Sequence, residues 1–291
     1  MSPERAASAA PARRAGPRPP VKATLTPRER YLPAAISVLS TVVVFGLLAR
    51  VITSAENWPL IRRQFFNLDA MGDAFPMVLR GFGINMAVWA IALVLIALFG
   101  VVVAIFRSLT GPWAAPLRVF AIVFIDLLRG MPSILLVLLF GLGVPALNLP
   151  GVTDSRLFWG SVALVLGYTA YTSEVYRSGI EAVPDGQRAA AKALGLTQWQ
   201  TLRHSILPQA IRNVIPALLN LAVALQKDVA LLSVIGAREA VREAQIFTAR
   251  TFNFSSYIVA TLLFLLATIP MARLTDWVTR RDQERRLQRT L

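Results

Sequence analysis

A long uncharged stretch of the chain, Gly81 to Phe106, constrains the fold more than any other feature. A helix that crosses the hydrocarbon core of a bilayer needs about 20 mostly apolar residues, and this stretch is long enough. The whole composition agrees, because 55% of the residues are apolar and 16% are charged, whereas a soluble domain has about 25% charged residues. The sequence therefore predicts an all-α, polytopic membrane protein.

Five further segments are apolar enough to be spans, which gives six in total. They cover residues 33–53, 119–142, 157–173, 212–237 and 255–272. The start of the chain is rich in proline and basic residues and has no apolar run, so we predict that it is disordered. The predicted organisation is a disordered basic tail (1–32), an extra transmembrane helix (33–53), an external connection (54–80), a transmembrane domain (81–272) that contains a polar loop (177–211), and a C-terminal tail (273–291).

The distribution of basic residues predicts the orientation of these spans. With a cytoplasmic N-terminus, twenty Lys and Arg residues lie in the inside segments and seven in the outside segments. Cytoplasmic loops of membrane proteins carry such an excess of Lys and Arg. We therefore expect both termini and the 177–211 loop in the cytoplasm. The net charge of +14 is explained by this bias, and we predict no binding of nucleic acid.

Several classes of chemistry are disfavoured by what the sequence lacks. The chain has no cysteine and one histidine, His204, so we predict no metal site, and we predict no cofactor and no catalytic residue. Its lysines are Lys22, Lys192 and Lys227, and none follows a glycine, so it has no Walker A phosphate loop. Energy for any pumping must come from another polypeptide.

The 177–211 loop has signals for two helices joined by a sharp turn. A turn at Pro184-Asp185-Gly186 precedes strong helix formers, and Gly195 suits the left-handed residue that closes a helix. Thr197 and Gln200 have capping-box spacing for a second helix, which we expect to end at Pro208. On that helix Trp199, Leu202 and Ile206 fall on one face. An ordinary amphipathic hairpin at the membrane surface is the alternative interpretation.

The run GQRAAAKALGLTQWQTLRHSILPQA resembles the EAA loop of permease subunits of ATP-binding cassette importers. That loop has the pattern Glu-Ala-Ala, three residues, Gly, nine residues, then Ile-x-Leu-Pro. Two positions depart from it, since Ala189 stands where the family usually has Glu and Ser205 where it usually has Ile. The matching positions are Ala190, Ala191, Gly195, Leu207 and Pro208.

Three more runs resemble the polar amino-acid permeases of this family, which serve His, Glu, Gln, Arg and opines. LLRGMPSILLVLLFGLGVP is similar to their FRGTP-type third span, AYTSEVYRSGIEAVPDGQ to the segment that enters the loop, and LQKDVALLSVIGAREA to their KDTSL-type segment. In the last run, Val229 and Ala230 replace the usual Thr-Ser. The resemblance covers about residues 72–280 and leaves the first span as an addition to a five-helix core.

The resemblance implies a function and a set of partners. It implies a permease subunit in a bacterial cytoplasmic membrane that imports polar amino acids or their derivatives by alternating access. The loop would dock into a separate ATPase subunit, the permease would pair with an identical or sister subunit, an extracytoplasmic binding protein would deliver substrate, and lipid would surround the spans. The alternatives from other classes are a secondary transporter or channel that works alone and a structural membrane scaffold that binds partners without transporting a substrate.

Two groups of site residues follow from the resemblance and from the charges inside the spans. Charged residues within a membrane are functional candidates, although such charges also serve as structural ion pairs. We expect Asp126 and Arg129, at i and i+3, to neutralise each other and to face the bundle interior, and Glu174 to anchor the loop through a basic partner. The expected ATPase-coupling residues are Gly186, Gln187, Ala189, Ala190, Ala191, Leu194, Gly195, Trp199, Leu207 and Pro208, and the expected substrate path contains Asp126, Arg129, Glu174, Lys227 and Asp228.

Overall fold

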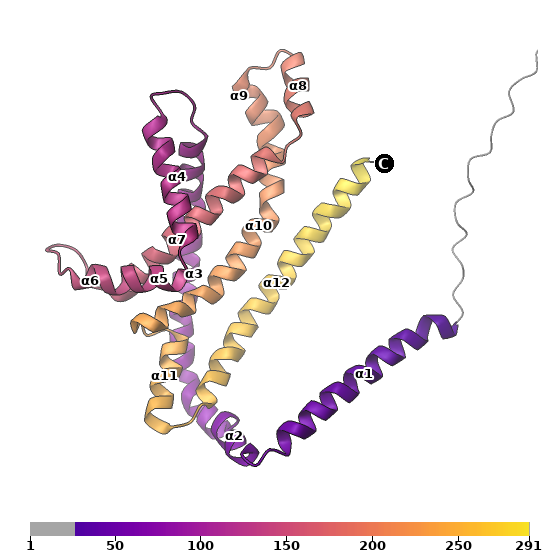
Figure 1. Cartoon of the computed structure of the whole chain (residues 1–291), viewed down its shortest axis with the longest axis vertical. Helices are drawn as coiled ribbons and strands as arrows, with labels where there is room; N and C mark the ends of the chain where they lie inside the picture. Colours follow the sequence, from indigo (N-terminus) through magenta and orange to yellow (C-terminus); the bar gives the residue numbers. More distant parts are fainter. Residues whose placement is uncertain (1–26, 291) are drawn as a thin grey trace, which may run out of the picture. The chain divides into compact units, whose positions relative to one another are not determined.

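The computed structural model describes residues 27–290 (Figure 1). Contacts divide the chain into two units that meet between Trp58 and Pro59. In the first unit, α1 (Pro27–Thr53) is one helix with exposed apolar side chains, which suits a helix surrounded by lipid. The predicted disordered tail lies outside the described residues up to residue 26, and from Pro27 onward its residues belong to α1.

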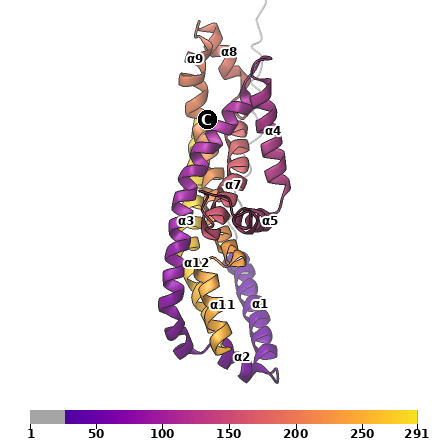
Figure 2. The same cartoon turned by 90° about the vertical axis from the view of Figure 1, so that its left-hand side faces the viewer.

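The second unit is built from helices only, within the described residues. The helices are α2 (Trp58–Phe65), α3 (Leu68–Ser108), α4 (Ala115–Gly130), α5 (Ser133–Leu138), a π-helix (Leu139–Gly143), α6 (Val144–Ala146), α7 (Arg156–Glu181), α8 (Asp185–Ala193), α9 (Gln198–Gln200), a second π-helix (Thr201–Ile206), α10 (Leu207–Asp228), a 3-10 helix (Val229–Ile235), α11 (Ala240–Thr251) and α12 (Ser255–Thr290). In Figure 2, α3, α11 and α12 run side by side. The predicted connection over 54–80 is largely helical, since α3 starts at Leu68, and the predicted tail from residue 273 continues α12.

Four helical stretches of the described chain are long and apolar enough to cross a membrane. They are Tyr31–Thr53, Trp58–Ser108, Gln198–Ile235 and Ser255–Asp282, and the bent pair of α4 and α5–α6 makes up to five. The chain is thus a multi-pass membrane protein, while the predicted span over residues 157–173 stays a prediction. That span coincides with α7, a helix whose buried face includes the polar residues Tyr168, Thr169, Thr172 and Ser173. Because α7 packs against protein on several sides, it does not need the hydropathy of a helix that faces lipid.

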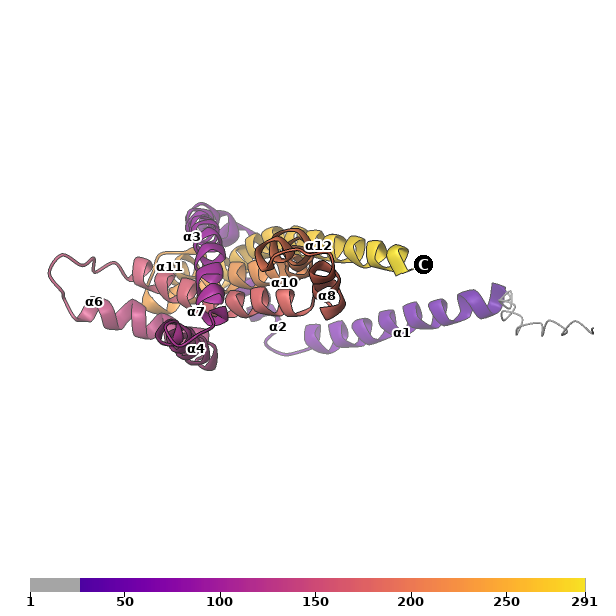
Figure 3. The same ribbon diagram turned by 90° about the horizontal axis from the view of Figure 1, so that it is seen from above.

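The predicted third span is broken into two helices rather than straight. Ala115–Gly130 and Ser133–Ala146 are bent by 105° at the break. Met131, which precedes Pro132, is extended with φ −96° and ψ 137°, as expected for a residue before proline. Pro132 then caps the next helix. Figure 3, which looks along the bundle, shows α5 and α6 projecting to one side of it.

The core of the second unit lies on both sides of α3. Glycines of α3 lie where neighbouring helices approach it closely. One apolar cluster joins α3, α4, α5, α7 and the 3-10 helix, and another joins α3, α11 and α12. A Cβ added at Gly81 would lie 2.7 Å from backbone atoms of Glu239 and Ala240. A Cβ at Gly100 would lie 2.8 Å from the Thr172 side chain. Residues 81 and 100 therefore allow α11 and α7 to pack closely on α3.

Candidate functional site

The hairpin formed by α8, α9 and the second π-helix lies at one end of the bundle, beyond the ends of α7 and α10 (Figure 1). Gly195 has the left-handed conformation that the sequence predicts, with φ +76°. The amide of Leu196 donates to the carbonyl of Ala191 over 3.1 Å and that of Gly195 to the carbonyl of Lys192 over 2.9 Å. This pair of bonds is a Schellman closure of α8.

The capping box at the start of α9 is confirmed. The amide of Gln200 donates to the Thr197 hydroxyl over 3.2 Å, and the Gln200 side chain accepts from the amide of Thr197 over 2.9 Å. Two further predictions are wrong. Pro208 does not end the helix but lies in the first turn of α10, where its missing N–H is tolerated. Trp199 is 66% exposed and does not share the buried face of Ile206, because the π-helix between them changes the helical phase.

Almost all of the predicted coupling residues are exposed. Ala191 is the exception at 4% exposure, so it packs inside the hairpin and offers no surface to a partner. The base of the hairpin is held by an apolar cluster of Val183, Ile206 and Ala210. The exposed members of the predicted set are Gly186, Gln187, Ala189, Ala190, Leu194, Gly195, Trp199, Leu207 and Pro208.

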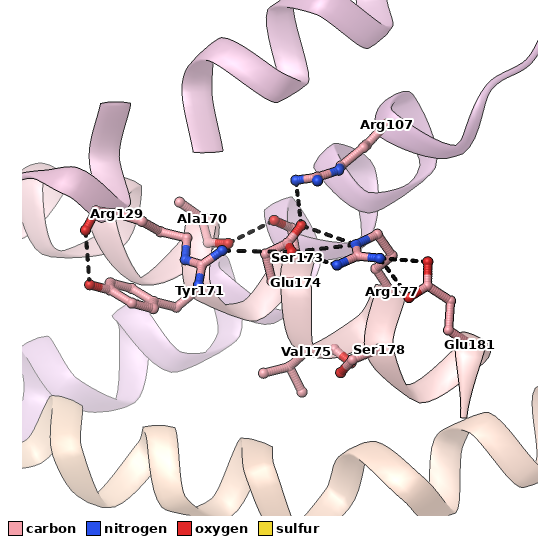
Figure 4. Close-up of polar contacts among 10 residues, drawn as sticks. All are labelled: Arg107, Arg129, Ala170, Tyr171, Ser173, Glu174, Val175, Arg177, Ser178 and Glu181. Carbon is pink, nitrogen blue, oxygen red and sulfur yellow. Dashed lines mark hydrogen bonds and ion pairs between the residues drawn. The ribbon is translucent and has the colours of Figure 1, made fainter. Parts of the chain in front are cut away.

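Glu174 on α7 joins three arginines close to the base of the hairpin (Figure 4). Its carboxylate lies 2.5 Å from Nη1 of Arg107 at the end of α3, 2.9 Å from Nη2 of Arg177 on α7 and 3.6 Å from Nη1 of Arg129 at the end of α4. Arg177 also pairs with Glu181 over 2.5 Å. The predicted basic anchor of Glu174 is therefore confirmed.

The electrostatics of this cluster keep Glu174 ionised. Partial burial alone would raise the pKa of its carboxyl, but the hydrogen bond from Arg177 and the charges of Arg107, Arg177 and Arg129 outweigh burial and hold the pKa below its usual value. Arg129 is the loosest member, since its side chain is 42% exposed and its guanidinium also lies 5.5 Å from the centre of the Tyr171 ring.

The predicted pairing of Asp126 with Arg129 is wrong. No ion pair joins them within the described residues, and Arg129 contacts Glu174 instead. Asp126 is exposed rather than turned to the bundle interior. The i,i+3 spacing allows a pair, but α7 brings Glu174 to the end of α4 and three arginines compete for it.

Lys227 and Asp228 point to different surroundings, as their adjacency on a helix predicts. The Tyr168 hydroxyl donates to Oδ2 of Asp228 over 2.9 Å. Lys227 is exposed and has no ion pair within the part of the chain whose side chains are described. Tyr168 also lines a mainly apolar cavity of about 300 Å³ between α3, α7 and α10, together with Thr172 and Tyr176. None of the five predicted path residues lines this cavity, so the structure does not gather them around one site.

The sequence pattern of the family described as "Binding-protein-dependent transport system inner membrane component" matches residues 109–282, which include the hairpin and the charged cluster from Arg129 onward. The chain belongs to this family. As an inner-membrane component it is a translocation subunit rather than a catalytic one. The family match confirms the resemblance to importer permeases read from the EAA-like loop.

Individual relatives agree with the family. The chain is 38% identical over 180 residues to the probable amino-acid ABC transporter permease protein y4tG of Sinorhizobium fredii (strain NBRC 101917 / NGR234), covering 62% of this chain and 75% of the relative. It is 32% identical over 218 residues to the probable glutamine ABC transporter permease protein GlnM of Bacillus subtilis (strain 168), covering 74% and 97%. A solved structure, the crystal structure of an amino acid ABC transporter with histidines, superposes with a TM-score of 0.66 at 29% identity, covering 72% of this chain and 96% of that one.

The polar contact between Asn85 and Glu239 was not predicted from the sequence. Glu239 is fully buried and caps α11 by accepting from the amides of Val241 and Arg242 over 3.1 and 2.8 Å. Asn85 of α3, also fully buried, donates to Glu239 over 2.9 Å and accepts from the amide of Ala240 over 3.0 Å. Burial raises the pKa of the Glu239 carboxyl. An amide within an uncharged span and an acid directly before a helix are the signals that indicate such a contact.

Proposed function

We propose that this chain is the permease subunit of an ATP-driven importer that moves polar amino acids, or their derivatives, across the cytoplasmic membrane of a bacterium. Relatives that match most of the chain carry the names of amino-acid and glutamine permeases, and the superposed crystal structure is of an amino acid ABC transporter. The transport is alternating access in a dimer of this chain with itself or with a sister permease.

The observation that carries the coupling mechanism is the exposed hairpin. Its closed turn at Gly195, its capped second helix and its exposed Leu194 and Trp199 form an accessible surface at one end of the bundle. A separate ATPase subunit hydrolyses ATP and docks on residues 177–211. Closure of two such ATPase subunits moves the hairpins, and an extracytoplasmic binding protein delivers the substrate on the other side.

The ion-pair cluster connects this hairpin to the substrate path. Arg177 and Glu181 lie at the end of α7 that leads into the hairpin, and Glu174 ties that end to α3 and to Arg129 beside the break between α4 and α5. Movement of the hairpin would therefore act directly on the broken span. Arg129, which is half exposed, can meet a substrate carboxylate, while Asp126, Lys227 and Asp228 are the other charged groups proposed along the path.

The test is reconstitution of the permease in proteoliposomes with and without its ATPase and binding protein. Uptake of labelled glutamine should require all components and ATP, and competition with unlabelled amino acids should reveal the preferred substrate. Uptake by the permease alone would contradict the proposal and would indicate a stand-alone transporter or channel.

A further inference from the structure

Beyond Asp185 at its first position, the hairpin contains no acidic residue. From Gly186 to Gln226 the sequence has neither Asp nor Glu, whereas Arg188, Lys192, Arg203 and Arg212 are basic. One of the positions without an acidic residue is Ala189, where similar loops carry glutamate. All charged residues of the docking surface from Gly186 onward are therefore basic.

Three of these four basic side chains have no counter-charge within the described chain. Arg188 is held by the end of α7 and by α8, since it donates to the carbonyl of Ile180 over 3.2 Å and its Nε lies 3.8 Å from Asp185. Lys192, Arg203 and Arg212 are exposed and form no ion pair with the side chains that the structure describes. Their charge is available to a partner.

An apolar tip lies among these charges. Leu194 is 80% exposed and Trp199 is 66% exposed, on either side of the Gly195 turn. Exposed aromatic and aliphatic side chains of this size, rimmed by polar groups, mark interaction sites. Beside them Ala189 and Ala190 are exposed and small, so the backbone of another protein could approach α8 closely.

We infer that the partner of this hairpin is an ATPase subunit whose docking groove has an acidic rim and an apolar floor. The inference rests on the proposed function and adds the chemistry of the partner surface. Lys192 and Arg203 meet the acidic rim, and Leu194 and Trp199 enter the floor. Anionic lipid headgroups would also attract the basic side chains, but α8 exposes alanines rather than the bulky apolar face that an interfacial helix inserts into lipid.

The test measures association of the purified permease with its ATPase subunit in nanodiscs of zwitterionic lipid. The variants are Lys192→Glu, Arg203→Glu and the double change, and the matched control is Arg250→Glu, an exposed residue of α11 at the other end of the bundle. Each reversal should weaken association about tenfold and the pair about a hundredfold, since close charge pairs across interfaces contribute at least 1.4 kcal/mol or so, about one factor of ten. The control should bind as the unchanged chain does.

Salt provides an independent measurement that needs no variant. The Debye length falls from about 30 Å at 0.01 M to about 8 Å at 0.15 M ionic strength, so association of the unchanged chain should weaken as salt rises. Normal, ATP-dependent association that is insensitive both to salt and to the reversals would overturn the acidic groove and leave the proposed function intact. An effect of the reversals only in nanodiscs with anionic lipid would also overturn it, in favour of a lipid contact. Absence of any ATPase association would contradict the proposed function itself.

Discussion

At the residue scale, Glu174 is the charged side chain that joins the most helices, because it forms ion pairs with arginines of α3, α4 and α7. Glu174→Gln would leave Arg107 without its counter-charge in a partly buried place and would leave Arg177 with Glu181 alone. We expect a loss of stability of about 1–3 kcal/mol, seen as a lower unfolding temperature in detergent. Asp126→Asn is the control, since Asp126 is exposed and unpaired within the described residues, and it should change stability by no more than about 0.5 kcal/mol.

The stabilisation by Glu174 should depend on pH in a definite direction. Its pKa in the folded protein is below its usual value, so folding favours the ionised form. The contribution is fully present above the unfolded pKa, about 4.3, and is lost as pH falls through the lower folded pKa. The stability difference between the unchanged chain and Glu174→Gln should therefore be constant from about pH 6 to 8 and shrink below about pH 4.3. A difference that grows on acidification would show that the carboxylate is not stabilised by its arginines.

Gly195 tests the shape of the hairpin without a steric clash. No atom lies within 4 Å of a Cβ added there, but its φ of +76° disfavours a branched side chain. Gly195→Val should strain the turn by about 1–2 kcal/mol, which lowers the ratio of closed to open hairpin about five- to thirtyfold and lowers ATP-coupled uptake, while membrane insertion is unchanged. Gly195→Asn should be milder because Asn visits this conformation. Equal uptake by both variants and the unchanged chain would show that ATP coupling does not depend on the geometry of this turn.

At the scale of elements, the hairpin was predicted well from local sequence signals, whereas the contacts between helices were predicted poorly. The extent of α8, the left-handed Gly195 and the Thr197 capping box depend on neighbours a few residues away and were predicted from the sequence. The π-helix after Gln200 and the break of the third span were missed, because each depends on how neighbouring helices pack. For the same reason the sequence paired Arg129 with Asp126 rather than with Glu174.

The contact between α3 and α11 gives a prediction at this scale with a control on the same helix. A methyl group at Gly81 would meet backbone atoms of Glu239 and Ala240 that cannot rotate away. Gly81→Ala should therefore separate the two helices, disturb the Asn85–Glu239 hydrogen bond and destabilise the protein by about 1–3 kcal/mol. Gly83→Ala, two residues along on an open face, should be neutral or stabilise α3 by up to about 1 kcal/mol. Thermal unfolding of both variants checks this, and equal stabilities would contradict the close packing.

At the scale of the whole chain, hydropathy identifies the membrane spans that face lipid. It fails to identify a span that is surrounded by other helices. The helix α7 falls outside the apolar stretches long enough to cross a membrane, although it contacts α3, α4, α5 and α10. A helix covered by others can carry Tyr, Thr and Ser side chains that are less favourable against lipid. The six-span topology with both termini inside therefore rests on the charge bias and on α7 crossing the membrane.

That topology can be tested with single cysteines, because the chain has none of its own. Ala193→Cys lies on the hairpin, Ala249→Cys on α11 and Ser54→Cys after α1, and all three positions are exposed. In spheroplasts that lack the ATPase subunit, a membrane-impermeant maleimide should label positions 54 and 249 directly and position 193 only after lysis. Labelling of position 193 from outside would reverse the orientation and remove the hairpin from the reach of any cytoplasmic ATPase. Labelling of position 249 but not of position 54 would instead contradict the external connection between α1 and α3, while the hairpin would remain on the cytoplasmic side.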